Sequence, residues 1–205
     1  MSKTSTSQTA HRVRPKATEE DLTLAAYEGE RPPAPDWFQD AIAKAPRTGS
    51  VEVEGASIAW RAWGDPAKRG LLLVHGNGAH GQWWDFIAPF LAEDYHVVAM
   101  TFSGMGDSGW REAYSFSLFN REQLAVCDAT GLFDRDEKPI IIGHSFGGII
   151  SLYTTLLEGG EKFAGALIVD SHLEPPGDER PRPPRRTSPN RIYSSFNDAL
   201  ARFRL

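Results

Sequence analysis

A serine flanked by glycines is the group in this 205-residue sequence with the clearest capacity for chemistry. Residues 139–150 read Pro-Ile-Ile-Ile-Gly-His-Ser-Phe-Gly-Gly-Ile-Ile, so Gly143, Ser145 and Gly147 complete a G-x-S-x-G pattern. Between a buried strand and a helix, this pattern is typical of a nucleophile elbow, a sharp turn that projects the serine hydroxyl into a cleft. The helix N-terminus beneath it favours a developing negative charge. By itself the pattern also fits a simple strand–turn–helix connection.

The segments around Ser145 have the composition that such a turn requires. The all-apolar run 140–142 predicts a buried strand, and the apolar segment 148–157 predicts the following helix. Gly148 lets that helix pack close to the strand. Three further apolar strands are predicted, and each ends in a polar or Gly-rich segment: 70–74 before the loop 75–81, 95–100 before the loop 103–109, and 165–169 before Asp170.

The remaining pattern predicts the fold class. Residues 51–54 and 57–63 alternate apolar and polar, which indicates an antiparallel hairpin turning at Gly55-Ala56. Helices are predicted at 83–91, at 118–132 and at 37–44, the last capped by Asp36 and docked through Trp37, Phe38 and Ile42. The order of elements predicts an α/β fold: an open, mostly parallel sheet with helices on both faces and an antiparallel N-terminal hairpin.

The composition limits the kinds of partner and location to be expected for this protein. The net charge of −5, with 22 basic and 27 acidic residues, gives no reason to expect nucleic acid as a partner. No apolar run approaches the roughly 20 residues of a membrane span, and the N-terminus lacks a signal-peptide core. The single cysteine, Cys127, cannot form an internal disulfide and is expected to be a buried, inert thiol. A cytoplasmic protein without metal or cofactor is the expectation.

The two ends of the chain differ from its centre. Residues 1–35 are polar and rich in Ser, Thr and Pro, which predicts a disordered tail. Residues 174–191 are dense in Pro and Arg and predict an irregular connection that reads better as a solvated basic linker than as an anion site. Residues 195–204 predict a short amphipathic helix.

Taken together, these motifs resemble the α/β-hydrolase superfamily, in its lid-bearing branch of serine esterases and C–C hydrolases. The resemblance covers about residues 48–205 and is carried by the His75-Gly76 loop, the Gly104-x-Gly106-x-Ser108 loop, the elbow at Ser145 and the Val169-Asp170 strand end. It implies a core of six strands over residues 36–172, followed by the start of a lid at 173–205 that is incomplete.

The resemblance also implies roles for individual residues. Ser145 would be the nucleophile, and the backbone N–H groups of Asn77 and Phe146 would form the oxyanion hole. Asp170 is a candidate for the acid of the catalytic triad, with a loop-capping role as the alternative. The expected substrate is a small ester, or a diketone cleaved at a carbon–carbon bond, in a pocket lined by His75, Gly76, Trp83 and His144.

One member of the triad is missing from this pattern. The family order is Ser, then acid, then His, and the usual acid and histidine follow strands that this sequence does not contain. His172 is the only histidine after the elbow. The expectation is a truncated hydrolase of impaired activity, since a serine hydroxyl without a base is a poor nucleophile. A protein that keeps this fold but binds a partner without catalysis is the alternative.

The loop Gly104–Gly109 also matches the G-x-G-x-x-G pattern of nucleotide-binding proteins. Nucleotide binding is disfavoured, since neither a helix nor a ribose-binding acid follows the loop.

Overall fold

The computed structural model describes residues 30–157, 159–171 and 194–195. Every helix and strand discussed below falls within one compact unit, residues 35–180. The predicted tail, the predicted lid segment, the predicted helix at 195–204 and His172 lie largely or wholly outside the described residues.

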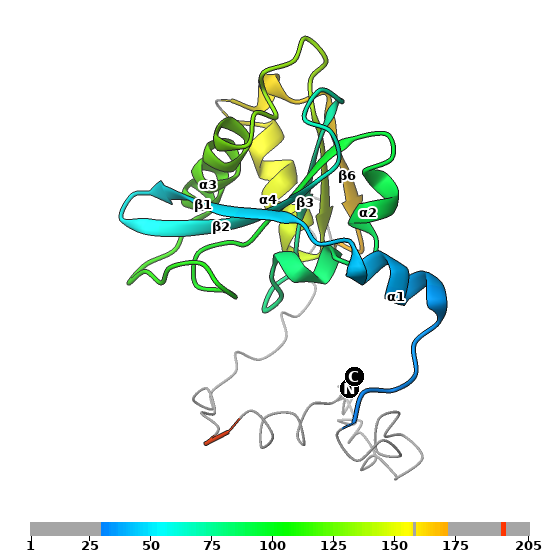
Figure 1. Cartoon of the computed structure of the whole chain (residues 1–205). Coiled ribbons are helices and arrows are strands. Elements are labelled where there is room, and N and C mark those ends of the chain that lie inside the picture. The colour runs from blue at the N-terminus through cyan, green and yellow to red at the C-terminus, as the bar shows by residue number, and fades with distance from the viewer. Residues whose placement is uncertain (1–29, 158, 172–193, 196–205) are drawn as a thin grey trace, which may run out of the picture. The chain divides into compact units, whose positions relative to one another are not determined.

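Six strands form a single sheet in the order β1-β2-β4-β3-β5-β6 (Figure 1). Strands β3, β4, β5 and β6 are mutually parallel, whereas β2 runs antiparallel to both β1 and β4. This confirms the predicted fold class. The strands span β1 (Arg47–Val53), β2 (Ala56–Trp63), β3 (Gly70–Val74), β4 (His96–Met100), β5 (Ile140–His144) and β6 (Gly165–Val169).

Side-chain alternation along the buried strands builds two cores. Leu72 and Val74 of β3 belong to the larger core, with Val126 of α3 (Phe116–Ala129) and Ile150 of α4 (Phe146–Thr155). Leu71 and Leu73 point to the opposite face. There they join Trp84 of the 3₁₀-helix η3 (Gly81–Trp84) and Ala88 of α2 (Ala88–Leu91). Helices therefore cover both faces, as the sequence predicts (Figure 1).

The hairpin turn lies one residue earlier than predicted. Glu54 and Gly55 are its two central residues, with φ of +47° and +81°, and Val53 pairs with Ala56. Two consecutive positive φ values match the twist of the flanking strands, which is why two-residue hairpin loops adopt them. Ala56 is consequently the first residue of β2 and not part of the turn.

Two predicted helices differ in detail. The segment 83–91 is not one helix but η3 followed by α2, because Pro89 has no N–H to donate to Asp85 and a continuous helix would lose that bond. Helix α1 (Asp36–Ala43) begins at Asp36, so this residue lies in its first turn and does not cap it; Pro35 precedes it without a side-chain hydrogen bond.

Helix α1 docks through two of the three residues that the sequence predicts. Phe38 stacks on Phe86 with 6.1 Å between ring centroids, and the ring of the half-exposed Trp37 lies 6.3 Å from that of Phe90. Ile42 is exposed, so its predicted docking role is wrong. The small Ala41, which was not predicted, is the buried residue of the helix and allows its close approach to the domain.

Cys127 is fully buried in α3, and burial raises the pKa of its thiol well above the usual range. The expectation of a buried thiol is therefore confirmed. Among the described helices, none has both the length and the apolar character needed to cross a bilayer.

Candidate active site

Ser145 occupies a strained turn between β5 and α4. Its φ is +51° and its ψ is −117°, and helix α4 begins at the next residue. Such a backbone conformation is unfavourable for a residue with a Cβ and costs about 1–3 kcal/mol. The strand–turn–helix arrangement that the G-x-S-x-G pattern predicts is present, with the unusual conformation falling on the serine itself.

Gly143 and Gly147 have no space for a side chain. A Cβ added at Gly143 would lie 2.6 Å from the carbonyl oxygen of Gly147. A Cβ added at Gly147 would lie 2.4 Å from the carbonyl oxygen of His75 and 2.7 Å from that of Val74. These neighbours are backbone atoms that cannot rotate away. Helix α4 therefore packs directly against the ends of β3 and β5.

The loop after β3 lies against the elbow. A Cβ added at Gly76 would be 3.3 Å from the Cβ of Ser145 and 2.8 Å from Nδ1 of His144. Within the described chain, the backbone N–H groups of Asn77 and Phe146 donate no hydrogen bond to protein atoms. Two free amide donors therefore belong to the two segments that meet at Ser145, as an oxyanion hole requires.

Both ring nitrogens of His75 form hydrogen bonds with backbone groups. The Phe102 amide donates to His75 Nε2 at 3.0 Å, so the proton is on Nδ1, which donates to the Gly76 carbonyl at 2.8 Å. Burial lowers the pKa of His75 to about 4, so the ring is neutral at pH 7. The ring is fully buried, and its nitrogens are not available to the substrate pocket in which the sequence placed them.

His144 and Trp83 form one wall beside the elbow. Their rings stack with 5.7 Å between centroids and 11° between planes, and 51% of Trp83 is exposed. His144 Nε2 lies 3.8 Å from a carboxylate oxygen of Asp170, whose side chain is 88% exposed. The structure thus brings three of the predicted site residues together beside Ser145.

A general base for Ser145 does not appear among the described side chains. None of the described histidines, His75, His80, His96 and His144, forms a hydrogen bond with Ser145 Oγ. His11 and His172 lie outside the described residues. The described part of the chain also contains no group of three or more His, Cys, Asp or Glu side chains placed to hold a metal ion.

The family of the chain follows from a match that begins in β3. The sequence model of the alpha/beta hydrolase family matches residues 71–205, about two thirds of the chain. The chain belongs to the alpha/beta hydrolase family. This establishes the superfamily that the motifs resemble.

Individual relatives of this alpha/beta hydrolase are distant and longer. An uncharacterized hydrolase of Bacillus subtilis (strain 168), YugF, is 23% identical over 121 residues, which are 58% of this chain and 42% of YugF. Esterase RhEst1 from Rhodococcus sp. ECU1013 superposes with a TM-score of 0.53 at 31% identity, covering 62% of this chain and 46% of that chain. The 2-hydroxy-6-oxo-6-phenylhexa-2,4-dienoate hydrolase of Rhodococcus sp. strain RHA1 gives 0.53 at 27% identity, with the same coverage. The chain spans less than half the length of each.

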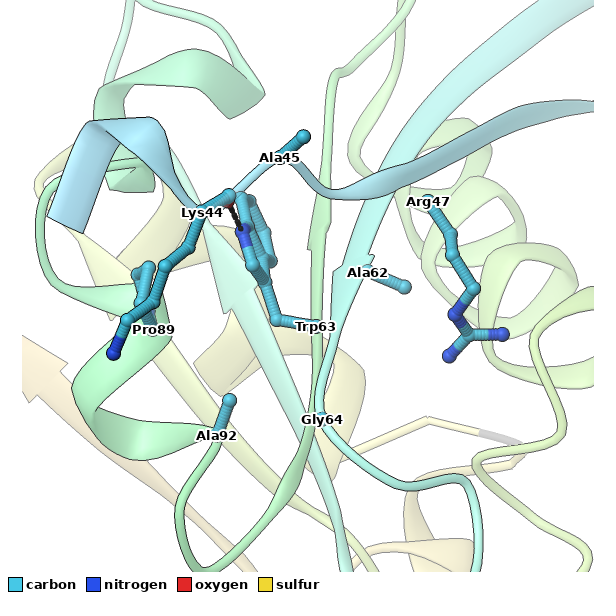
Figure 2. Close-up of a pocket in the computed structure, with 8 residues that line it drawn as sticks. All are labelled: Lys44, Ala45, Arg47, Ala62, Trp63, Gly64, Pro89 and Ala92. Carbon is cyan, nitrogen blue, oxygen red and sulfur yellow. Dashed lines mark hydrogen bonds between the residues drawn. The ribbon is translucent and has the colours of Figure 1, made fainter. Parts of the chain in front are cut away.

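A cavity of about 260 Å³ lies near the start of β4, at the opposite end of the parallel strands from Ser145 (Figure 2). Its lining includes Trp63, whose indole N–H donates to the Lys44 carbonyl at 3.1 Å. Trp63 pairs with Val97 near the start of β4, whereas Ser145 follows the carboxyl end of β5. This cavity is therefore separate from the candidate active site. Lys44 and Arg47 extend to opposite sides of it in Figure 2 and do not converge on one point.

Sequence reasoning missed one residue at the elbow. Ser171 contacts the backbone of Ser145 from the end of β6, at a separation of 26 residues. No motif includes Ser171, and a lone serine after a strand carries no signal of its own. Only the pairing of β6 with β5 brings it to the candidate active site.

Proposed function

We propose that this protein is a serine hydrolase that acts on a small ester or related carbonyl substrate through an acyl-enzyme on Ser145. The observation that carries the proposal is the conformation of Ser145: a strained, positive-φ serine between a buried parallel strand and a helix. Strain of this kind persists only where the surrounding structure imposes it, and it is concentrated at functional sites.

The geometry supports a specific sequence of steps. Ser145 Oγ attacks the carbonyl carbon of the ester while its proton passes to a base, which creates a tetrahedral oxyanion. The amides of Phe146 and Asn77 donate to that oxygen. When the intermediate collapses, the alcohol leaves with the proton, and water then releases the acid from Ser145. Loss of one such donor typically costs about 3 kcal/mol in the transition state.

The substrate would lie against the wall formed by Trp83 and His144, next to Gly76. A half-exposed indole stacked on an imidazole offers an apolar surface to the acyl or alcohol group. Asp170 remains our candidate for the triad acid because it follows β6 at the same sheet edge as Ser145. The carbon–carbon cleavage of diketones is the alternative reaction within the same site, and the similarity to the Rhodococcus dienoate hydrolase favours keeping it.

We further propose that turnover by the 205-residue chain is impaired. None of the described histidines reaches Ser145 Oγ, and loss of the histidine in a serine protease lowers turnover by about a millionfold. The competing hypothesis is a binding module that keeps the fold without catalysis. The two free amide donors and the strained serine favour the hydrolase.

Labelling with a fluorophosphonate probe tests the proposal. Because no described base activates Ser145, we expect slow labelling, with one adduct mapped to Ser145 by peptide mass analysis and no adduct on Ser145→Ala. Ser50→Ala, an exposed serine in β1, is the matched control and should be labelled like the parent chain. No adduct on the parent chain, together with no hydrolysis of p-nitrophenyl esters, would favour the binding module.

Added imidazole tests the impairment separately. A diffusible base should accelerate ester hydrolysis by the parent chain above the rate with Ser145→Ala, which measures the background reaction of imidazole itself. Rapid turnover without imidazole would show that the chain already supplies a base, and the impairment hypothesis would be wrong.

A further inference from the structure

The backbone of Ser145 is held by two residues at the end of β6, Val169 and Ser171. Its amide donates to the Val169 carbonyl at 2.9 Å, and its carbonyl accepts from Ser171 Oγ at 2.8 Å. The next acceptor for this hydroxyl, the Val169 carbonyl, is at 3.4 Å, so the bond to Ser145 is the shorter one. Both polar backbone groups of the strained residue are therefore bound by the neighbouring strand end.

Asp170, between these two residues, has a strained backbone of its own. Its φ is +50°. Among the described non-glycine residues, only Glu54, Ser145 and Asp170 have positive φ, and Glu54 belongs to the hairpin turn. The other two are neighbours across the β5–β6 pair, since His144 pairs with Val169. The turn at Asp170 redirects the chain after β6 and places Ser171 on the elbow.

Gly148 provides the space that the Ser171 hydroxyl occupies. A Cβ added at Gly148 would lie 2.0 Å from Ser171 Oγ, closer than any real contact. The G-x-S-x-G pattern ends at Gly147 and does not account for the glycine that follows it. Its close approach to Ser171 gives a reason for a third glycine in the first turn of α4.

We infer that Ser171 is a positioning residue that holds Ser145 in its strained conformation. Its hydroxyl binds the same carbonyl that accepts from the amides of Gly148 and Ile149, at 3.0 and 3.2 Å, in the first turn of α4. Ser171 thus joins the end of β6, the elbow and the start of α4 at one oxygen atom. The consequence for catalysis rests on the proposed function of Ser145, whereas the consequence for the elbow does not.

Amide hydrogen exchange on the full 205-residue chain tests the inference. In Ser171→Ala we expect the amides of Ser145, Gly148 and Ile149 to exchange about fivefold faster, the factor that one typical net hydrogen bond represents. Ser171→Thr retains the hydroxyl and should restore the parent rates. Ser115→Ala is the matched control, because it removes one hydroxyl hydrogen bond at the N-cap of α3 and should leave these three amides unchanged.

Fluorophosphonate labelling separates this inference from the proposed function. If the parent chain is labelled, Ser171→Ala should be labelled several-fold more slowly and Ser171→Thr at the parent rate. If the parent chain is not labelled but the exchange result holds, the proposed function fails and the role of Ser171 in the elbow stands. Unchanged exchange in Ser171→Ala, an equal rise in Ser115→Ala, or labelling at the parent rate would overturn the inference.

Discussion

Arg111 and Glu122 form an ion pair that is almost entirely withdrawn from solvent, with 3.2 Å between Nη2 and Oε1. The Glu122 carboxylate also accepts from the amide of Ser103 at 3.0 Å and from its hydroxyl at 2.5 Å. The same arginine donates to the carbonyls of Val53 and Glu54. One pair therefore ties the loop after β4 to both α3 and the hairpin.

Removal of Arg111 should be strongly destabilising. Arg111→Ala leaves the buried Glu122 carboxylate without its counter-charge, which typically costs about 3–5 kcal/mol. The exposed pair Arg121–Glu54 offers a matched control, since its side chains are 46% and 53% exposed and such pairs contribute about 0–1 kcal/mol. Urea unfolding of Arg111→Ala and Arg121→Ala measures both. Equal losses in the two variants would contradict the prediction.

Replacement of Ser145 by glycine should stabilise the fold while removing the nucleophile. Glycine adopts positive φ without strain, so Ser145→Gly relieves a backbone cost of about 1–3 kcal/mol, partly offset by its greater freedom when unfolded. Ser145→Ala removes the same hydroxyl but keeps the strain. We expect Ser145→Gly to be about 1 kcal/mol more stable than Ser145→Ala in chemical denaturation. A less stable glycine variant would show that the conformation is not strained.

A methyl group at Gly147 should disrupt the elbow. In Gly147→Ala the new Cβ would overlap two carbonyl oxygens of the chain around His75, and overpacking against backbone typically costs about 1–3 kcal/mol. Gly165→Ala in β6 is the control, because nothing lies within 4 Å of its Cβ, and we expect a change of about 0.5 kcal/mol or less. Thermal unfolding compares the two, and a similar melting temperature for both variants would refute the steric argument.

Acid should weaken the fold through His75. Burial lowers the pKa of His75 from 6.5 to about 4. Between these two values the His75 ring is mostly protonated in the unfolded chain and mostly neutral in the folded chain. The stability due to the neutral ring is fully present above pH 6.5 and falls as the pH drops toward 4, by about 3 kcal/mol in total. The lowered pKa of His96, also mainly a result of burial, acts in the same direction.

Unfolding free energies measured between pH 7 and pH 4 test this dependence. His75→Gln removes the titrating ring, so its stability should depend less steeply on pH in this interval, even if the variant is less stable at pH 7. The same slope in the parent chain and in His75→Gln would show that His75 does not contribute.

The sequence by itself determined the fold class and the elbow. Apolar runs within β3, β4 and β5 specify buried parallel strands, and the glycines around Ser145 specify a turn that admits no Cβ. Both signals are local, since each depends on residues within a few positions of one another. The apolar pattern of residues 83–91 predicted one helix, and this prediction was wrong because Pro89 interrupts the segment.

Only the tertiary structure decided which residues surround Ser145. The pairing of β6 with β5 brings Ser171 to the Ser145 carbonyl, and the loop after β3 places Gly76 against the same residue. The tertiary structure also buries the His75 ring, whose two nitrogens form hydrogen bonds with the Gly76 carbonyl and the Phe102 amide. The contacts of Ser145 with Ser171 and with Gly76 join residues that are 26 and 69 positions apart, so their geometry depends on how the strands are ordered and paired, which no short stretch of sequence encodes.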